Sequence, residues 1–306
     1  MKFTFNKQFM VLMFLLLNCF ASYAANEDLI TNQITIKLTE AGTLPDKIAS
    51  SKKNLVTNLK IIGEINGTDL LFIREMAGSD VKGNGTSGNL SVLDLSEARF
   101  VAGGDSYYHY YYTGYDCHTS NDIISEYSFI GCHSLKSVNI PSSVTEIRES
   151  TFSGCSSLTS VNIPSSVTKI GELAFNECSS LTSVNIPLRV TSIEESAFSG
   201  CSGLRSIYVY AETVPSTVAG AFEGCDSKNC TLYVPKGTYD AYWLSEWGYF
   251  ENIVEFDATN IRNIVAEPEV QENARYAVNG QRLTAPVKGI NLVKYNNGRV
   301  KKEIVK

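Results

Sequence analysis

Apolar residues recur at fixed positions through the middle of the chain, with a period of 23 residues. The segment CSSLTSVNIP begins at Cys155 and occurs again, unchanged, from Cys178. Five units in this register follow the pattern A-F-x-x-C-x-x-L-x-x-V-x-I-P-x-x-V-T-x-I-x-E. A fixed period of this length is typical of a solenoid, whose turns bury their apolar side only by stacking on one another.

Each unit predicts one short strand with a buried face. In the second unit Leu158, Val161 and Ile163 are apolar. Val161 and Ile163 alternate with the polar residues Ser160 and Asn162. Pro164 ends the strand because it cannot donate a ladder hydrogen bond. Outside the strand, one phenylalanine and one cysteine per turn form columns, at Phe129, Phe152, Phe175, Phe198, Phe222, Cys132, Cys155, Cys178, Cys201 and Cys225.

Weaker copies of the pattern extend the repeat in both directions. Strands of the same type are expected at 56–61, 90–95 and 232–235, with a short helix over 69–77 whose N-cap is Thr68. The fold class is therefore a leucine-rich-repeat solenoid of about seven turns. Its short parallel strands are expected to lie about 4.8 Å apart.

The units resemble the leucine-rich repeats of BspA-like bacterial surface proteins, from Val56 to Phe256. The stretch 234–255 is similar to the closing segment of such proteins. We expect its aromatic residues to form a lid over the open end of the solenoid, namely Tyr239, Tyr242, Trp243, Trp247 and Phe250. The resemblance implies adhesion or recognition at the bacterial surface, often of host proteins, and it implies no particular ligand.

The first 24 residues have the pattern of a secretory signal peptide. Two lysines precede an apolar run over 9–17, and small residues lead to a cleavage site after Ala24. A lipoprotein anchored through Cys19 is the alternative. The predicted organisation is a signal peptide (1–24), an N-terminal cap with two degenerate repeats and a tyrosine-rich insertion (25–125), the repeats with their C-terminal cap (126–257), and a linker with a small β tail (258–306). The protein is expected to be secreted or exposed at the cell surface.

The tail differs from the rest of the chain in charge. From Arg262 onward it has nine Lys or Arg residues and four Glu, with Asn-Gly turns typical of hairpins. Its ending, KGINLVKYNNGRVKKEIVK, is similar to the last strands of Bacteroidetes C-terminal sorting domains, with Asn291 where a tyrosine is common. The tail could therefore serve in export or anchoring, or act as a passive cap.

Charge narrows the class of partner. Without residues 1–24 the chain has 24 Lys or Arg and 32 Asp or Glu residues, so its net charge is 24 − 32 = −8. An acidic chain without a basic stripe argues against nucleic acid and anionic membranes. After the signal peptide no apolar run is long enough to span a membrane. We expect an extracellular protein or glycan as the partner.

Neither the cysteines nor the acids predict a cofactor or a metal. Seven cysteines follow Cys19, and the five column members suit buried free thiols; a disulfide that involves Cys117 or Cys230 stays open. No C-x-x-C motif is present, and His109, His118 and His133 lack an evident set of partners. A column of glutamates, Glu149, Glu172 and Glu195, has too few oxygen donors for calcium.

The strongest candidate for a binding site is the tyrosine-rich segment YYHYYYTGY at 107–115. Tyrosine offers a large contact area at low entropic cost, which is why binding loops favour it. The segment is expected to be an inserted loop that either binds a ligand or clasps the side of the solenoid. Together with the variable positions of the last strands, the candidate residues are Tyr107, Tyr108, Tyr110, Tyr111, Tyr112, Tyr115, Arg205, Tyr208 and Tyr210.

These observations predict an exported, non-catalytic repeat protein that binds a protein or glycan at the cell surface. A purely structural role is the alternative. A glycan-processing enzyme is a third, because carboxyl groups lie near the tyrosine-rich segment at Asp105, Asp116, Asp122 and Glu126, although they form no motif.

Overall fold

The computed structural model describes residues 28–218, 220–257, 272–277, 281–283, 285–295 and 300–305. The expected signal peptide and Cys19 lie outside these residues. The chain divides into two compact units between Glu255 and Phe256. Each unit is described by itself.

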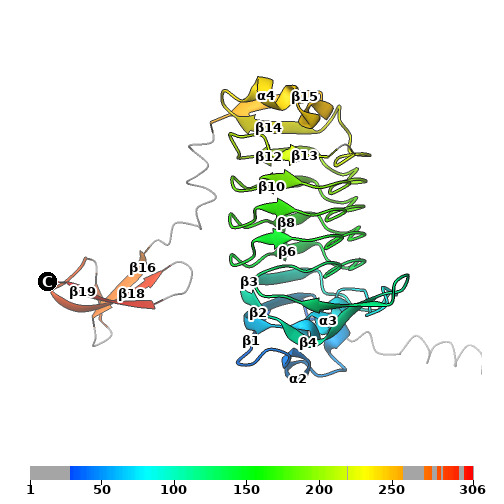
Figure 1. The fold of residues 1–306 in the computed structure, drawn as a ribbon. Helices are drawn as coiled ribbons and strands as arrows, with labels where there is room; N and C mark the ends of the chain where they lie inside the picture. Colours follow the sequence, from blue (N-terminus) through cyan, green and yellow to red (C-terminus); the bar gives the residue numbers. More distant parts are fainter. Residues whose placement is uncertain are drawn as a thin grey trace, which may run out of the picture. The chain divides into compact units, whose positions relative to one another are not determined.

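The first unit is a stack of turns with its main strands on one side (Figure 1). Along the stack these strands are β1 (Ile34–Lys37), β2 (Asn58–Ile65), β3 (Val92–Phe100), β6 (Ser137–Asn139), β8 (Ser160–Asn162), β10 (Ser183–Ile186), β12 (Ser206–Val209), β14 (Thr231–Pro235) and β15 (Asn252–Phe256). The strands from β1 to β8 pair in parallel, as do β10, β12 and β14. The seven strands from β2 to β14 confirm the expected solenoid, and β1 adds a strand that the sequence pattern did not reveal.

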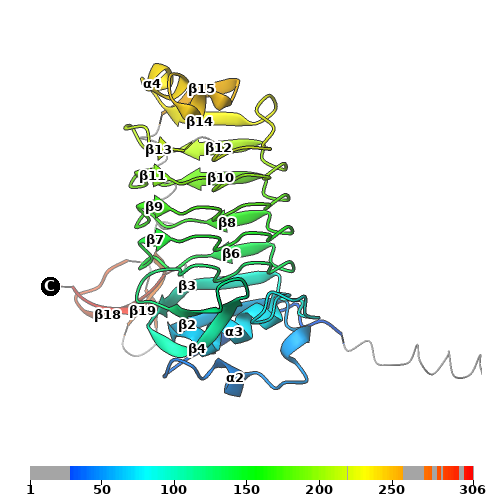
Figure 2. The ribbon, with the colours of Figure 1, turned by 45° about the vertical axis from the view of Figure 1, so that its right-hand side comes forward.

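The other two sides of each turn are also hydrogen-bonded to the next turn. Short parallel strands form a second sheet (Figure 2), in the order β13 (Ser216–Thr217), β11 (Ser192–Ile193), β9 (Lys169–Ile170) and β7 (Glu146–Ile147). On the third side the Phe152 amide donates to the Ala174 carbonyl, and the Phe175 amide donates to the Ala197 carbonyl, both at 2.7 Å. Backbone groups are thus satisfied by the neighbouring turns.

A column of stacked phenylalanines fills the core behind this third side. Phe175 is fully buried, and its ring centroid lies 5.2 Å from that of Phe152 and 5.1 Å from that of Phe198, with the rings within 9° of parallel. Trp247 and Phe250 close the column by packing against Phe222, at 4.9 and 5.1 Å. We call the five rings from Phe129 to Phe222 the phenylalanine column.

Insertions lengthen the chain between β2 and β3 and between β3 and β6, compared with the later turns. Helix α3 (Gly67–Met76) follows β2, after the short α2 (Leu44–Lys47) and the 3-10 turn η1 (Lys53–Leu55) that precede β2. The N-cap of α3 is Asn66, so the expected cap at Thr68 was wrong: the Asn66 side chain and the Asp69 carboxylate at N3 form a reciprocal capping box.

The closing segment forms α4 (Tyr239–Trp243) and the 3-10 turn η2 (Glu246–Tyr249). Tyr242, Trp247 and Phe250 are buried as expected of a lid, and the Trp247 indole donates to the Pro215 carbonyl at 3.0 Å. Tyr239 and Trp243 are 40% and 48% exposed, so the expectation that they also cover the core was wrong. A helix as short as α4 can direct only one of its faces towards the core, so Tyr242 is buried and the other residues of α4 are exposed.

The second unit is an antiparallel sheet with the strand order β17 (Arg282–Leu283), β16 (Glu272–Ala277), β18 (Gly289–Tyr295) and β19 (Val300–Val305). The Asn-Gly turns themselves lie outside the described residues. Asn291 is buried, where its side chain accepts from the Val287 amide at 3.0 Å and donates to the Val287 carbonyl. Asn291 thus holds the segment before β18 in place through these two hydrogen bonds.

Candidate functional site

The tyrosine-rich segment is a β-hairpin, and the expected loop was wrong. Strand β4 (Gly103–Tyr110) pairs antiparallel with β5 (Tyr115–Thr119), with Tyr108 opposite Cys117. Gly114 turns the chain at the tip with a φ of +68°, a conformation that favours glycine. The sequence signals for a hairpin were the Thr-Gly turn and the alternation of β5, whose Cys117 side chain is buried.

The base of the hairpin is fixed to the first full repeat. Tyr107 is fully buried, and its hydroxyl donates to the Glu126 carbonyl at 2.7 Å. Burial raises the pKa of Tyr107 well above its usual range. Tyr108 and Tyr110 both stack on Tyr127, with centroid distances of 5.3 and 5.2 Å. These three tyrosines of the hairpin therefore act as a clasp.

A buried arginine joins the hairpin to helix α3. The Arg74 side chain has no exposed surface, and its guanidinium carbon lies 5.0 Å from the centroid of the Tyr108 ring. It donates to the carbonyls of Tyr127, Ser128 and Asp80 and to the hydroxyl of Ser79, at 2.8 to 3.1 Å. The repeat pattern did not identify Arg74, although an arginine within the apolar run LLFIREMA was a signal.

The tip of the hairpin is free of these contacts. Tyr111 and Tyr112 are 84% and 85% exposed, and Tyr115 is 59% exposed. The Tyr112 ring meets Tyr110 and Tyr111 edge-on, at centroid distances of 5.8 and 5.9 Å. We call Tyr111, Tyr112 and Tyr115 the tyrosine tip. The base of the hairpin thus forms the expected clasp, and its tip is an exposed aromatic surface.

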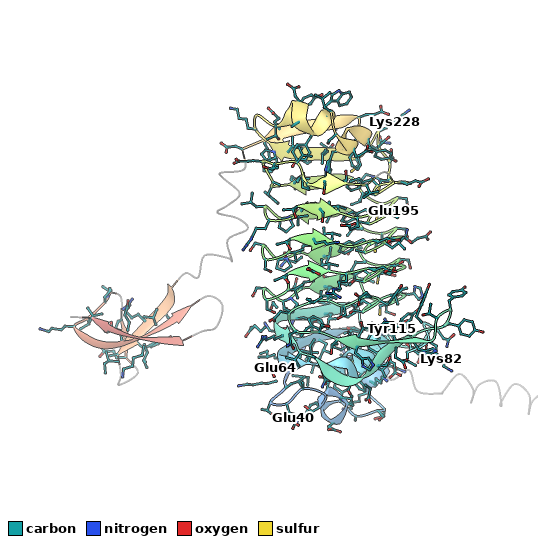
Figure 3. All side chains as sticks on the ribbon, in the orientation of Figure 1. Glu40, Glu64, Lys82, Tyr115, Glu195 and Lys228 are labelled. Atoms are coloured by element: carbon teal, nitrogen blue, oxygen red, sulfur yellow. The ribbon has the colours of Figure 1, made fainter. Side chains whose placement is uncertain are left out.

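A glutamate column runs along the turns beside the hairpin. The Tyr127 hydroxyl donates to the Glu149 carboxylate at 2.6 Å, and Glu126, one turn earlier, pairs with Arg148 at 2.9 Å. Backbone hydrogen bonds from one turn to the next hold Glu149, Glu172 and Glu195 in register. Figure 3 shows Tyr115 and Glu195 on the same side of the stack. Glu126, 23 residues before Glu149, also belongs to this glutamate column, in addition to the three residues expected from the sequence.

The other candidate ligand-binding residues lie elsewhere on the solenoid. Arg205, Tyr208 and Tyr210 are on or beside β12, and β6, β8 and β10 separate β12 from β3, after which the hairpin begins. The Arg205 guanidinium donates to the carbonyls of its own turn, and Tyr208 stacks on Tyr233 with centroids 4.4 Å apart. The structure does not bring these three residues to the tyrosine tip.

The outer face of the main sheet carries aligned polar side chains. Ser137 pairs in register with Ser160, and Asn139 with Asn162. The Ser160 hydroxyl donates to that of Ser137 at 3.3 Å. From β6 to β10 this face is polar, uncharged and nearly identical from turn to turn. The same column continues to Asp94 in β3 and to Tyr208 in β12.

Two of the four carboxyl groups near the hairpin have their pKa shifted away from what general acid catalysis needs. A hydrogen bond with His109 lowers the pKa of Asp116, and hydrogen bonds from Arg99 lower the pKa of Asp122. A general acid in glycoside hydrolysis needs the opposite shift. Asp105 accepts from the Thr68 hydroxyl at 2.9 Å.

All seven described cysteines are buried thiols. Burial raises the pKa of Cys178 and Cys225 to about 12. The Cys178 thiol also donates to the Phe152 carbonyl of the preceding turn at 3.2 Å, and Cys155, Cys201 and Cys225 make the same contact one turn apart. The column thus adds weak hydrogen bonds to its apolar packing. No group of three or more potential metal ligands gathers within the part of the chain that the structure describes.

Comparison with known proteins supports the repeat assignment. Residues 105–237 match the family model of the BspA type leucine rich repeat region in six copies. No curated protein matches the chain significantly. Over the residues described, no helix has the length and apolarity needed to cross a membrane.

The solved structures that are similar to the chain include the following three. A leucine rich repeat protein of T. pallidum is 25% identical, over 45% of this chain and 64% of that one, with a TM-score of 0.36. A leucine-rich repeat protein from Bacteroides ovatus is 21% identical, over 73% and 54%, with a TM-score of 0.41. A leucine rich cell surface protein from Faecalibacterium prausnitzii is 16% identical, over 79% and 91%, with a TM-score of 0.23. The alignments span less than two thirds of the length of the first two proteins.

Proposed function

Because residues 105–237 match the model of the BspA type leucine rich repeat region, we propose that the protein is a non-catalytic, exported binding protein that contacts an extracellular macromolecule through the tyrosine tip. The observation that carries this proposal is the contrast within one hairpin. Its base is stacked and hydrogen-bonded, whereas Tyr111, Tyr112 and Tyr115 are largely exposed.

This arrangement suits recognition for two reasons. Exposed tyrosines bury a large amphipathic area when a partner covers them, and they lose little side-chain entropy. A support that is already rigid avoids part of the ordering cost of binding. Arg74 and Tyr127 supply that support, because they tie the hairpin to α3 and to the first full repeat.

The repetitive face of serine and asparagine side chains is the competing contact surface. Side chains that repeat almost unchanged from Ser137 to Ser183 give a partner little to distinguish one turn from the next. We therefore assign this face to the scaffold and specific contact to the tyrosine tip. A purely structural protein would need neither surface for binding.

The test is binding of the protein without residues 1–24 to arrays of purified extracellular-matrix proteins and glycans. Changing Tyr111, Tyr112 and Tyr115 together to serine should weaken the strongest interaction at least about tenfold, because aromatic contacts dominate such interfaces. The matched control changes exposed apolar residues of the cap, Tyr239→Ser with Leu244→Ser, and should leave affinity within about twofold. Equal loss in both variants would refute the proposal, as would loss only in an Asn162→Ala, Asn185→Ala variant.

Export is the second part of the proposal. We expect the signal peptide to be removed after Ala24, which places the protein outside the cell or on its surface. The mass of the N-terminal peptide of the exported protein distinguishes this cleavage from lipid attachment at Cys19. The sorting role of residues 258–306 is tested by deleting them and measuring how much protein reaches the medium and the cell surface.

A further inference from the structure

We infer that the partner of the tyrosine tip is a lysine- or arginine-rich polypeptide segment, which lies across the tip and along the adjoining glutamate column. This inference rests on the proposed function, since it takes the tip as the contact surface. What it adds is the chemistry of the partner.

The tip and the glutamate column form one connected surface. From the tip, Tyr112 contacts Tyr110, which stacks on Tyr127, and the Tyr127 hydroxyl donates to Glu149. The amide of Ser150 donates to the carbonyl of Glu172 at 2.8 Å, and the next turn repeats this contact with Glu195 at 3.0 Å. An extended partner segment can therefore contact the aromatic rings and the carboxylates of the column at the same time.

The last two carboxylates of the column, Glu172 and Glu195, have no partner within the described part of the chain. Glu126 pairs with Arg148, and Glu149 accepts the Tyr127 hydroxyl, whereas the exposed side chains of Glu172 and Glu195 form neither a hydrogen bond nor an ion pair there. They lie on adjacent turns, and neighbouring turns are about 4.8 Å apart along the stack. Two like charges on adjacent turns repel each other. A cation placed between them would relieve this repulsion.

The net charge of the repeat region as a whole favours the same class of partner. Across residues 105–237 there are seven Lys or Arg residues and thirteen Asp or Glu residues. Lys169 pairs with Glu194, and Arg148 pairs with Glu126 and Glu146. Lys82, exposed near the hairpin (Figure 3), is an opposing charge. The overall balance attracts cations.

The tyrosines favour a cationic polypeptide over a simple metal ion. Lysine and arginine side chains bind the faces of tyrosine rings through cation–π contacts, and their aliphatic stems cover apolar surface. In an extended segment, alternate side chains on one face lie about 6.8 Å apart, so two or three of them can reach the rings and carboxylates together.

The experiment measures fluorescence anisotropy of a labelled peptide of alternating lysine and serine, about twelve residues long and thus about 40 Å when extended. The peptide should bind the protein without residues 1–24 at about 50 mM salt and more weakly at about 500 mM salt, because screening reduces the attraction. A glutamate–serine peptide of equal length should not bind.

Variants with matched charge distinguish a site from general attraction. Glu172→Gln with Glu195→Gln should weaken binding of the lysine–serine peptide about three- to tenfold, the range for two exposed ion pairs. The control is Glu40→Gln with Asp240→Gln, two exposed acids elsewhere on the first unit, and it should change affinity less than about twofold. Tyr111→Ser with Tyr112→Ser should also weaken binding, and Lys82→Ala should strengthen it.

Equal weakening in the two acidic variants would overturn the inference, because it would show attraction by net charge alone. Absence of peptide binding at low salt would overturn it as well. The proposed function is judged separately. If the tyrosine variant abolishes binding to an array protein and Glu172→Gln with Glu195→Gln does not, the tip binds a partner that is not cationic.

Discussion

Phe175→Ala is the most informative single change for the solenoid itself. Phe175 is fully buried and stacks on a phenylalanine of each neighbouring turn, at 5.2 and 5.1 Å. Burying a phenylalanine contributes about 1.5–3 kcal/mol, and each stacked pair adds about 0.5–1.5 kcal/mol beyond that area. The free energy of unfolding should therefore fall by about 3–5 kcal/mol, as is usual for such truncations.

Urea unfolding measured by circular dichroism gives this difference. The control is Phe72→Ala, because Phe72 is only partly buried and packs outside the phenylalanine column; its cost should be about 1 kcal/mol. Hydrogen exchange adds the spatial readout, since turns that stack on one another should lose protection together. A cost for Phe175→Ala no larger than the control, or lost protection confined to residues 174–196, would refute the idea of a continuous column.

Three further predictions follow from local contacts. Cys178→Ala should cost about 1–2 kcal/mol in unfolding free energy and more than Cys178→Ser, because a serine hydroxyl can still donate to the Phe152 carbonyl; equal costs would show that the thiol acts only as filler. Glu177 has a φ of +58° where other turns have glycine, so Glu177→Gly should raise stability by about 0.5–1 kcal/mol; a loss would mean that its side chain makes a needed contact. Burial opposes ionisation of Asp94, yet hydrogen bonds from Ser96 and the charge of Lys60 hold its pKa below the ordinary value. Asp94→Asn should therefore cost about 1 kcal/mol near pH 7, and the difference should vanish as the pH falls through the folded pKa of Asp94; a cost that does not change with pH would contradict this.

The repeat was predictable because every turn repeats the same physical requirement. Leucine, valine and isoleucine at fixed offsets specify the inward face, and the proline specifies where the strand ends. The phenylalanine and cysteine columns could be assigned to the core for the same reason. Their stacking distances and the thiol hydrogen bonds could not be assigned, because they depend on how closely the turns approach.

The candidate site was only partly predictable because it is not repetitive. Asn66 and Thr68 are both good N-caps, and the reciprocal contact with Asp69 decides between them in the structure. The tyrosine-rich segment was identified by composition, but its division into clasp and tip depends on Arg74 and Tyr127. Arg74 lies far before the tyrosine-rich segment in the sequence, and Tyr127 lies outside its motif. No local sequence pattern could therefore reveal their contacts with it.

The most direct test of the tyrosine tip as the contact surface is site-specific photo-crosslinking. A photoreactive phenylalanine analogue replaces Tyr112 in one variant and Asn162, on the serine and asparagine face, in another. With the partner found on the array, the variant at position 112 should form a crosslinked complex upon irradiation, and the variant at position 162 should not. Crosslinking from position 162 alone would place the partner on the sheet face and contradict the proposed function.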